Sequence, residues 1–280
     1  MFTALFNDPA ALRDLYCALE GVLLSPDVPV TINTLENVLY MDLYNDISFE
    51  IAGKLVVLIE HQSTINPNMA LRFLSYITRV LEHTVKGKNI YSKKRIGIPW
   101  PEFYVLYNGI VPYPDETTLR LSDLFEQPQD LGLPEKSRPL LELEVKVLNI
   151  NEGRNMAIAQ RCRKLAEYSA FISKARTYLT ELENREEAIY EAVKYCQKHD
   201  ILKEFLEKNA REVLNMMFTE WNMDDAIAVT REEALEEGLE RGFSLGIEKG
   251  RADGQNYFLE LLDQGLSIDE IKKRLTQTDT

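Results

Sequence analysis

Two apolar strand patterns between residues 46 and 62 constrain the fold of this chain more than any other part of its sequence. They read DISFEI, then a short turn that contains glycine, then KLVVLIEHQ. The second pattern is a nearly continuous apolar run, which is typical of a strand buried on both faces of a sheet. We therefore expect this strand to lie inside a sheet that helices flank.

Helix and strand signals continue on both sides of this stretch. Residues 9–20 are predicted to form a helix, with Asp8 as its N-cap, Pro9 in its first turn and Gly21 after its end. A second helix is predicted from Met69 to about Val85. Its expected buried stripe consists of Leu71, Leu74, Ile77, Thr78 and Leu81. Further strand patterns occupy residues 30–40, 102–107 and 141–149, and the pattern is helical from about residue 155 onward.

These elements predict an α/β fold, in which a mixed sheet flanked by helices is followed by an all-helical C-terminal extension. A chain of 280 residues has room for one catalytic domain with an appendage, or for two modest domains. We divide it into a core (residues 1–178), a helical extension (residues 179–231) and an acidic tail (residues 232–280).

The register of the hairpin decides which of its side chains lie together. If residues 52–54 form a three-residue loop, Asp46 lies directly opposite Glu60 on the neighbouring strand. A two-residue loop would send the two acids to opposite faces. The acids could also cap the hairpin in water, but Glu60 and Gln62 end a strongly apolar strand, which favours a functional site.

Directly opposed carboxylates repel each other unless a positive charge lies between them. Mg²⁺ or Mn²⁺ suits such a pair, because both cations prefer oxygen ligands. Side chains alternate along a strand, so Gln62 shares the face of Glu60, whereas the imidazole of His61 points to the other side as an ordinary core histidine. The sequence therefore predicts that Asp46, Glu60 and Gln62 converge at one metal site.

An acid on one strand followed by E-x-K on the next is the signature of the PD-(D/E)XK nucleases, and here it takes the form of Asp46 and Glu60-His61-Gln62. The longer string NDISFEIAGKLVVLIEHQSTINPNMALRFLSYI resembles the Rpn family of recombination-promoting nucleases, which are also described as transposase-like. The segments KNIYSKKR, PEFYVLYNG, LELEVKVLNIN, CRKLAEYSAFI and FTEWNMDDA extend this resemblance over about residues 2–255. The resemblance implies a PD-(D/E)XK restriction-endonuclease-like core and Mg²⁺-dependent hydrolysis of DNA in recombination or mobile elements.

The same resemblance assigns roles to the motif residues. Asp46, Glu60 and Gln62 would be catalytic, and the two carboxylates together with the backbone carbonyl of His61 would be the metal ligands. The family usually carries glutamine where the wider class has lysine. A neutral amide can hydrogen-bond an attacking water but brings no charge, so we expect slower cleavage and greater reliance on the metal.

Other polar residues could join this site. Arg72 and Tyr76, four apart on the second predicted helix, could reach a phosphate or a neighbouring motif residue, although both are equally explained as ordinary surface and boundary residues. Asp14 or Glu20 on the first helix could add a third acid, and their spacing does not choose between them.

The net charge of −13 argues at first against a nucleic-acid partner. The acidity is concentrated at the C-terminal end: residues 1–178 carry 19 basic and 21 acidic side chains, whereas residues 179–280 carry 13 and 24. Two basic segments, residues 86–95 and 154–176, allow a locally basic face for DNA, although each could equally be a solvated surface run.

The tail has a glycine at every fourth position from Gly238 to Gly254. Each glycine weakens a helix by about 1 kcal/mol relative to alanine. The segment is therefore either a mobile linker or a helix whose glycine stripe permits close approach between chains. We interpret the tail as an assembly element that could join copies of the chain into a homo-oligomer.

Remaining features narrow the class of protein. No apolar run reaches the roughly 18 residues that span a bilayer, and the first residues do not resemble a signal peptide, so we expect no membrane partner and a cytoplasmic location. The three cysteines are odd in number and far apart, which indicates buried, reduced thiols. P-loop, dinucleotide-binding and serine-hydrolase motifs are missing from the sequence.

The function predicted from these features is that of a Mg²⁺-dependent DNA endonuclease. Two alternatives stay open. A catalytically silent DNA-binding or assembly protein would keep the nuclease fold while Gln62 fails to support turnover. A scaffold, in which the α/β core only presents the C-terminal helices, would depend on residues 232–280 for association.

Overall fold

The structure is a computed structural model that describes residues 1–33, 46–134 and 138–217, together with positions 246, 249, 257, 261 and 270. The chain divides into two compact units, Met1–Phe218 and Thr219–Thr280. The predicted glycine stripe lies outside the described residues, apart from Gly246. The proposed division at residues 178 and 231 remains a prediction.

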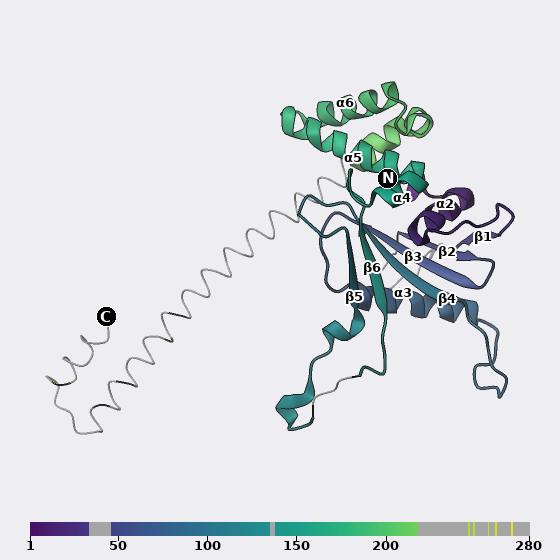
Figure 1. Ribbon diagram of the computed structural model, residues 1–280, viewed down its shortest axis with the longest axis vertical. Helices are drawn as coiled ribbons and strands as arrows, with labels where there is room; N and C mark the ends of the chain where they lie inside the picture. Colours follow the sequence, from purple (N-terminus) through teal and green to yellow (C-terminus); the bar gives the residue numbers. More distant parts are fainter. Residues whose placement is uncertain are drawn as a thin grey trace. The chain divides into compact units, whose positions relative to one another are not determined.

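The first unit is built on a six-stranded mixed sheet with the order β1-β2-β3-β4-β6-β5 (Figure 1). Its strands are β1 (Val30–Ile32), β2 (Ile47–Ile51), β3 (Leu55–Gln62), β4 (Trp100–Tyr107), β5 (Glu116–Arg120) and β6 (Glu144–Asn149). Strands β3, β4 and β6 are parallel, whereas β1 pairs with β2, β2 with β3 and β5 with β6 in antiparallel fashion. A mixed sheet combined with helices confirms the predicted α/β class.

Helices lie on both faces of this sheet. They are α1 (Phe2–Leu5), α2 (Pro9–Glu20), α3 (Met69–Thr84), α4 (Met156–Arg161), α5 (Arg163–Glu181) and α6 (Arg185–Lys198), with further helical residues at 203–217 and short 3₁₀ turns at Leu121–Leu124 and Pro128–Leu131. None of the described helices is both long and apolar enough to cross a membrane. All three cysteines are free thiols, with Cys162 and Cys196 buried, as the sequence predicted.

Helix α3 covers one face of the sheet. Its buried side chains pack against alternate residues of the central strands, such as Val56 and Leu58 of β3 and Val105 of β4. The predicted buried stripe of this helix is wrong in part, because Leu71 is 51% exposed while Phe73 is fully buried. Apolar residues lie on more than one side of α3, so helical spacing alone does not identify the side that meets the sheet.

Helices α1, α2 and α5 cover the opposite face. Phe2 of α1 and Tyr168 of α5 both contact the ring of His61 on β3. The hydroxyl of Tyr104 on β4 lies 2.6 Å from a carboxylate oxygen of Glu20 on α2. Successive side chains along a strand point to opposite faces. Those of the central strands therefore alternate between contact with α3 and contact with these three helices.

Local chemistry sets both ends of α2. The carboxylate of Asp8 accepts a hydrogen bond from the N–H of Ala11 at 2.9 Å, and Gly21 ends α2 in the left-handed region, both as predicted. The strand predicted at residues 30–40 is observed only as β1, and residues 34–45 lie outside the described part. Strand β5 was not predicted, because ETTLR is a polar edge strand that its pairing with β6 organises.

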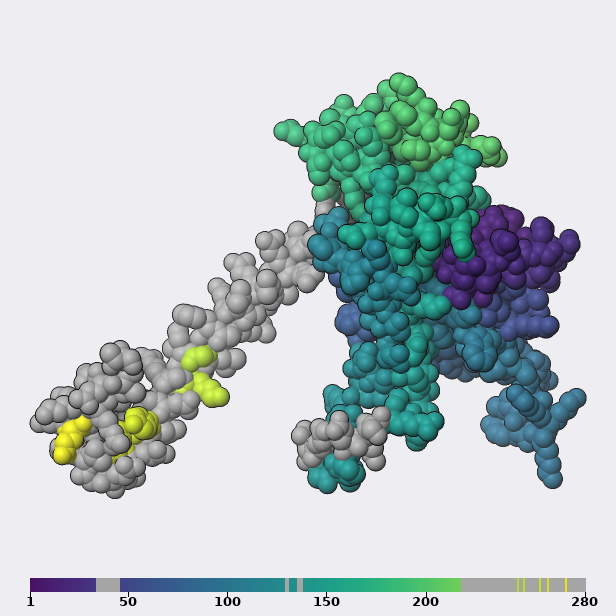
Figure 2. Space-filling view, viewed as in Figure 1, coloured from purple at the N-terminus to yellow at the C-terminus, as the bar shows by residue number. Residues whose placement is uncertain are grey.

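The segment between α3 and β4 projects from the body of this unit (Figure 2). It begins after Thr84 and ends at Trp100, whose N–H donates to the carbonyl of Lys54 at 2.8 Å. The segment is thereby fixed at the end of the sheet where β3 and β4 begin.

Candidate active site

The turn between β2 and β3 sets the register of the hairpin. Ala52 and Gly53 both have left-handed backbones, with φ of 53° and 62°. Across this turn Ile51 pairs with Leu55, so residues 52–54 form the loop. The predicted three-residue loop is confirmed, and the two-residue alternative is wrong.

Asp46 immediately precedes β2, and the ladder places it opposite Glu60 near the end of β3. Its Oδ2 accepts a hydrogen bond from the backbone N–H of His61 at 2.6 Å. A carboxylate acceptor makes such a bond short and strong. The bond ties the start of β2 to the end of β3 and holds Asp46 beside Glu60.

Glu60 is a buried acid, with 4% of its surface exposed. Its Oε2 lies 3.2 Å from Nη2 of Arg72, while its Oε1 has no hydrogen-bond partner among the described residues. Burial, reinforced by Asp46 and opposed by Arg72, raises the pKa of Glu60 to about 8. A buried carboxylate oxygen without a donor is a position that a proton or a cation would stabilise.

Arg72 reaches Glu60 from the first turns of α3. Its Nη2 also donates to the hydroxyl of Tyr76 at 2.8 Å, and its Nη1 lies 3.4 Å from the sulfur of Met69. Tyr76 is fully buried, so its hydroxyl is a fixed acceptor that holds the guanidinium in place. Of the two roles that the sequence left open for Arg72, contact with a motif residue is the one that the structure shows.

Gln62 lies two residues beyond Glu60 on β3 and also faces α3. Its Nε2 is 2.9 Å from the sulfur of Met69, which is a weak acceptor. The amide of Gln62 is therefore held only loosely and retains hydrogen-bonding capacity. Gln62 and Glu60 share one face, as strand alternation predicted.

The ring of His61 points to the opposite face. It stacks on Phe2 with 4.8 Å between ring centroids, and its Nε2 lies 3.0 Å from the hydroxyl of Tyr168. Burial lowers the pKa of His61 to about 3, so the ring is neutral near pH 7. Only the backbone of His61 belongs to the carboxylate site, and its imidazole is part of the core.

The expectation that Asp14 or Glu20 adds a third acid is not met. Both lie on α2, which covers the face opposite α3, and Asp14 is exposed. Glu20 instead accepts hydrogen bonds from Tyr104 at 2.6 Å and from Lys146 at 2.5 Å. Which face of a sheet a helix covers is a tertiary property that the spacing of acids along the helix does not encode.

Sequence reasoning missed Ser48. It follows Asp46 by two positions on β2, is 4% exposed, and its hydroxyl has no hydrogen-bond partner within the described ranges. Because it pairs with Leu58, it faces α3 like the carboxylates. Side chains two residues apart on a strand share a face, so the spacing of Ser48 from Asp46 is the signal that could have identified it.

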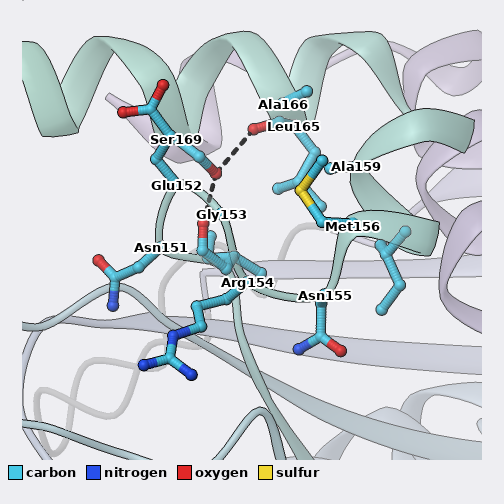
Figure 3. Close-up of a pocket in the computed structure, with 12 residues that line it drawn as sticks. Asn151, Glu152, Gly153, Arg154, Asn155, Met156, Ala159, Leu165, Ala166 and Ser169 are labelled. Atoms are coloured by element: carbon cyan, nitrogen blue, oxygen red, sulfur yellow. Dashed lines mark hydrogen bonds between the residues drawn. The ribbon is translucent and has the colours of Figure 1, made fainter.

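A separate hollow of about 310 Å³ lies on the other side of the sheet, between the loop after β6 and helices α4 and α5 (Figure 3). Ser169 lines it, and its hydroxyl lies within hydrogen-bonding distance of the carbonyl oxygens of Ile150 and Leu165. Its walls are mainly apolar, and neither Asp46 nor Glu60 lines it. The paired carboxylates are therefore the better candidate for hydrolytic chemistry.

Together the sheet and the site define an α/β protein with two carboxylates and an amide gathered on one face of a central hairpin. The chain belongs to the family described as "Putative transposase, YhgA-like", whose model matches residues 33–191. That range includes Asp46, Glu60, Gln62 and Arg72, and it confirms the family resemblance read from the sequence. No curated protein and no solved structure matches the chain.

Proposed function

We propose that this protein is a metal-dependent DNA endonuclease on a PD-(D/E)XK core, with Asp46, Glu60 and Gln62 as its catalytic residues. The observation that carries the proposal is the placement of Asp46 beside Glu60, whose buried Oε1 has no hydrogen-bond donor among the residues that the structure describes. Membership of a transposase-like family supports a role associated with mobile elements.

The donor set suits Mg²⁺ or Mn²⁺, which take carboxylate and carbonyl oxygens. Asp46 and Glu60 would hold the cation, with the backbone carbonyl of His61 as a further ligand. Within the described ranges no group of three or more His, Cys, Asp or Glu side chains could hold a metal ion. When bound, the cation would supply the positive charge on which phosphodiester hydrolysis depends.

The residues around the carboxylates have defined tasks in this proposal. Gln62, whose amide contacts the weak acceptor Met69, would turn that amide toward the attacking water and orient the water by a hydrogen bond. Arg72 is 32% exposed at its side chain, so it can contact a phosphate oxygen of the DNA while Tyr76 keeps it in place.

The decisive experiment is cleavage of supercoiled plasmid by the full-length protein with Mg²⁺ or Mn²⁺, compared with the same mixture containing EDTA. Nicked or linear product is expected only with the metal. Asp46→Asn and Glu60→Gln should each abolish it. Asp115→Asn is the matched control, because Asp115 is an acid that forms an exposed ion pair with Arg154 and should leave cleavage unchanged.

Cleavage by Asp46→Asn and Glu60→Gln at the parent rate would place the active site elsewhere. Cleavage that persists in EDTA would contradict metal dependence. A fold check by far-UV circular dichroism accompanies each variant, since loss of activity supports the proposal only in a folded protein.

A second candidate is a catalytically silent DNA-binding or assembly protein on the same core. The observation that favours it is the ion pair between Glu60 and Arg72, which already gives one carboxylate a positive partner. Gln62 also lacks the charge of the lysine found in the wider class. DNA binding without product under any divalent metal would establish this second function over the first.

A further inference from the structure

The segment between α3 and β4 carries an unbalanced positive charge. Between Val85 and Trp100 the sequence has five basic residues and no acidic one. They are Lys86, Lys88, Lys93, Lys94 and Arg95, and none has an ion-pair partner in the part of the chain that the structure describes. In a chain with a net charge of −13, such a segment is suited to a polyanion.

Large side chains within this basic run and directly after it face solvent. Tyr91 is 92% exposed, Trp100 72% and Ile90 60%. Exposed rings between basic side chains are the combination by which proteins hold unpaired bases, because the rings stack on the bases while the cations neutralise phosphates. A purely solvated basic run would not require exposed aromatic rings.

The segment has a defined local shape. The N–H of Tyr91 donates to the side chain of Asn89 at 3.0 Å, and the N–H of Lys94 donates to Oγ of Ser92 at 3.3 Å. Residues 92–95 line an open depression of about 450 Å³ in the projecting part of the chain. Cations and rings are thus presented together on one projection.

The projection lies at a fixed separation from the carboxylates along the sheet. Trp100 pairs with Leu55 where β3 begins, and Glu60 lies five residues further along β3. At about 3.3 Å per residue this separation is roughly 17 Å. A stacked strand advances about 3.4 Å per nucleotide, so Trp100, at the base of the projection, lies roughly five nucleotides from the carboxylates.

We propose that residues 86–100 bind single-stranded DNA, with the five cations on its phosphates and Tyr91 and Trp100 on its unpaired bases. The inference rests on the proposed function for the choice of DNA as the polyanion. It deepens that function by naming an unpaired strand, held several nucleotides away from the reacting phosphate, as part of the substrate.

The test is fluorescence anisotropy of the full-length protein in EDTA, where cleavage cannot contribute. The probes are a labelled oligothymidylate of about 20 nucleotides and a duplex of the same length. The variant Lys93→Ala/Lys94→Ala/Arg95→Ala should bind the oligothymidylate at least about tenfold more weakly and show a smaller salt dependence. The matched control is Lys198→Ala/Lys208→Ala/Arg211→Ala, which removes three exposed cations from the helical region and should bind like the parent.

A second pair of variants tests the stacking. Tyr91→Ala and Trp100→Ala should each weaken binding of the oligothymidylate by about three- to tenfold while changing duplex affinity little. Both rings are mostly exposed, so neither variant should disturb the fold. Unchanged affinity in both variants, or a duplex that the parent binds more tightly than the single strand, would overturn the proposal.

The failure of this inference is distinguishable from failure of the proposed endonuclease. Binding lost in the triple variant, with no plasmid cleavage by the parent, supports the projection as a DNA surface and contradicts the enzyme. Plasmid cleavage with equal oligothymidylate binding by the parent and the triple variant overturns the projection and leaves the enzyme. Binding to phosphatidylserine vesicles that the triple substitution abolishes, with oligothymidylate affinity unchanged, would assign the projection to a membrane surface instead.

Discussion

Arg72 on α3 and Glu60 on β3 form an ion pair of 3.2 Å, in which the carboxylate side chain is 5% exposed and the arginine side chain 32%. Opposed carboxylates on a hairpin led us to expect a positive charge between them. The chain supplies part of that charge itself through Arg72. A metal ion would therefore share Glu60 with an arginine, which makes this pair the first feature to test.

Arg72→Met should destabilise the protein by about 1–3 kcal/mol, because it leaves a buried carboxylate without its charged donor. Urea denaturation in EDTA at about pH 9, above the pKa of Glu60, measures this loss with the carboxylate ionised. The matched control is Arg120→Met, which breaks an exposed ion pair with Glu144 and should cost under about 1 kcal/mol. Glu60→Gln combined with Arg72→Met should recover most of the loss. Equal losses in Arg72→Met and Arg120→Met would show that the buried pair contributes no more to the free energy of unfolding than an exposed pair does.

The contribution of Glu60 to the stability of the metal-free protein should fall as the pH rises from about 4.5 to about 8. Burial raises the pKa of Glu60 from 4.5 to about 8, so folding favours its protonated form. The resulting stabilisation is fully present below pH 4.5 and is lost as the pH rises through 8. Unfolding midpoints in urea at several pH values, in EDTA, measure the trend.

Glu60→Gln is the control for this pH dependence, because the amide does not titrate. The difference in stability between the parent and Glu60→Gln should change across this pH window in favour of the variant. His61 has its pKa lowered to about 3 and destabilises the fold on the acid side, but it is present in both proteins and cancels in the difference. A difference that stays constant with pH would mean that Glu60 titrates normally.

Mg²⁺ or Mn²⁺ should raise the melting temperature of the parent, because a ligand that binds only the native state stabilises it. Asp46→Asn and Glu60→Gln should each lose most of this gain. Differential scanning fluorimetry with and without EDTA measures it, and Asp115→Asn serves again as the acid whose removal should have no effect. A metal-dependent gain that survives in both site variants would place the cation elsewhere in the chain.

The hairpin could be predicted from the sequence because two apolar strand patterns flank a short turn, whereas the sequence alone allowed either a two- or a three-residue loop. Left-handed backbone at Ala52 and Gly53 gives the three-residue loop, and this loop gives the register that places Asp46 opposite Glu60. The pairing is local, so no knowledge of the rest of the fold was required. Strand β5 could not be predicted in this way, because its pairing with β6 comes from a distant part of the chain.

The parts of the site that depend on tertiary packing were predicted less well. The spacing of Arg72 and Tyr76 indicated that both could reach the motif, but only the packing of α3 on the sheet shows that Arg72 meets Glu60. Glu20 was a reasonable third acid until α2 proved to cover the opposite face. Ser48 was overlooked because a serine within an apolar strand carries little signal of its own.

Gln62→Lys tests the departure from the lysine of the wider class. The substitution removes the contact with Met69 but adds a positive charge near the carboxylates, where it would help orient a water and stabilise a developing anion. We expect retained metal binding and cleavage at the parent rate or faster, measured by plasmid nicking over time. Gln62→Leu is the contrasting variant and should cleave more slowly, because it can no longer hydrogen-bond a water. Equal nicking rates for the parent, Gln62→Lys and Gln62→Leu would show that Gln62 takes no part in catalysis.

Gly109→Ala should be among the more damaging small substitutions in this fold. A Cβ at Gly109 would lie 2.0 Å from the carbonyl oxygen of Ser63 and 2.3 Å from the hydroxyl of Tyr107. Relieving these contacts requires backbone movement directly after β4, and overpacking of this kind costs about 1–3 kcal/mol. The neighbouring Asn108 donates its N–H to the carbonyl of Gln62 at 2.8 Å, so the movement should also disturb the end of β3.

Gly97→Ala is the matched control for this substitution. A Cβ there would meet no atom within 4 Å, so its stability should stay within about 1 kcal/mol of the parent or rise slightly, because alanine restricts the unfolded chain. Urea denaturation compares the stability of the two variants, and plasmid nicking compares their activity. Gly109→Ala should be the less stable and the slower of the two, since the strain it introduces lies beside the strand that carries Glu60 and Gln62. If Gly109→Ala matches Gly97→Ala in both measurements, the close approach of Ser63 and Tyr107 to this glycine does not restrain the site.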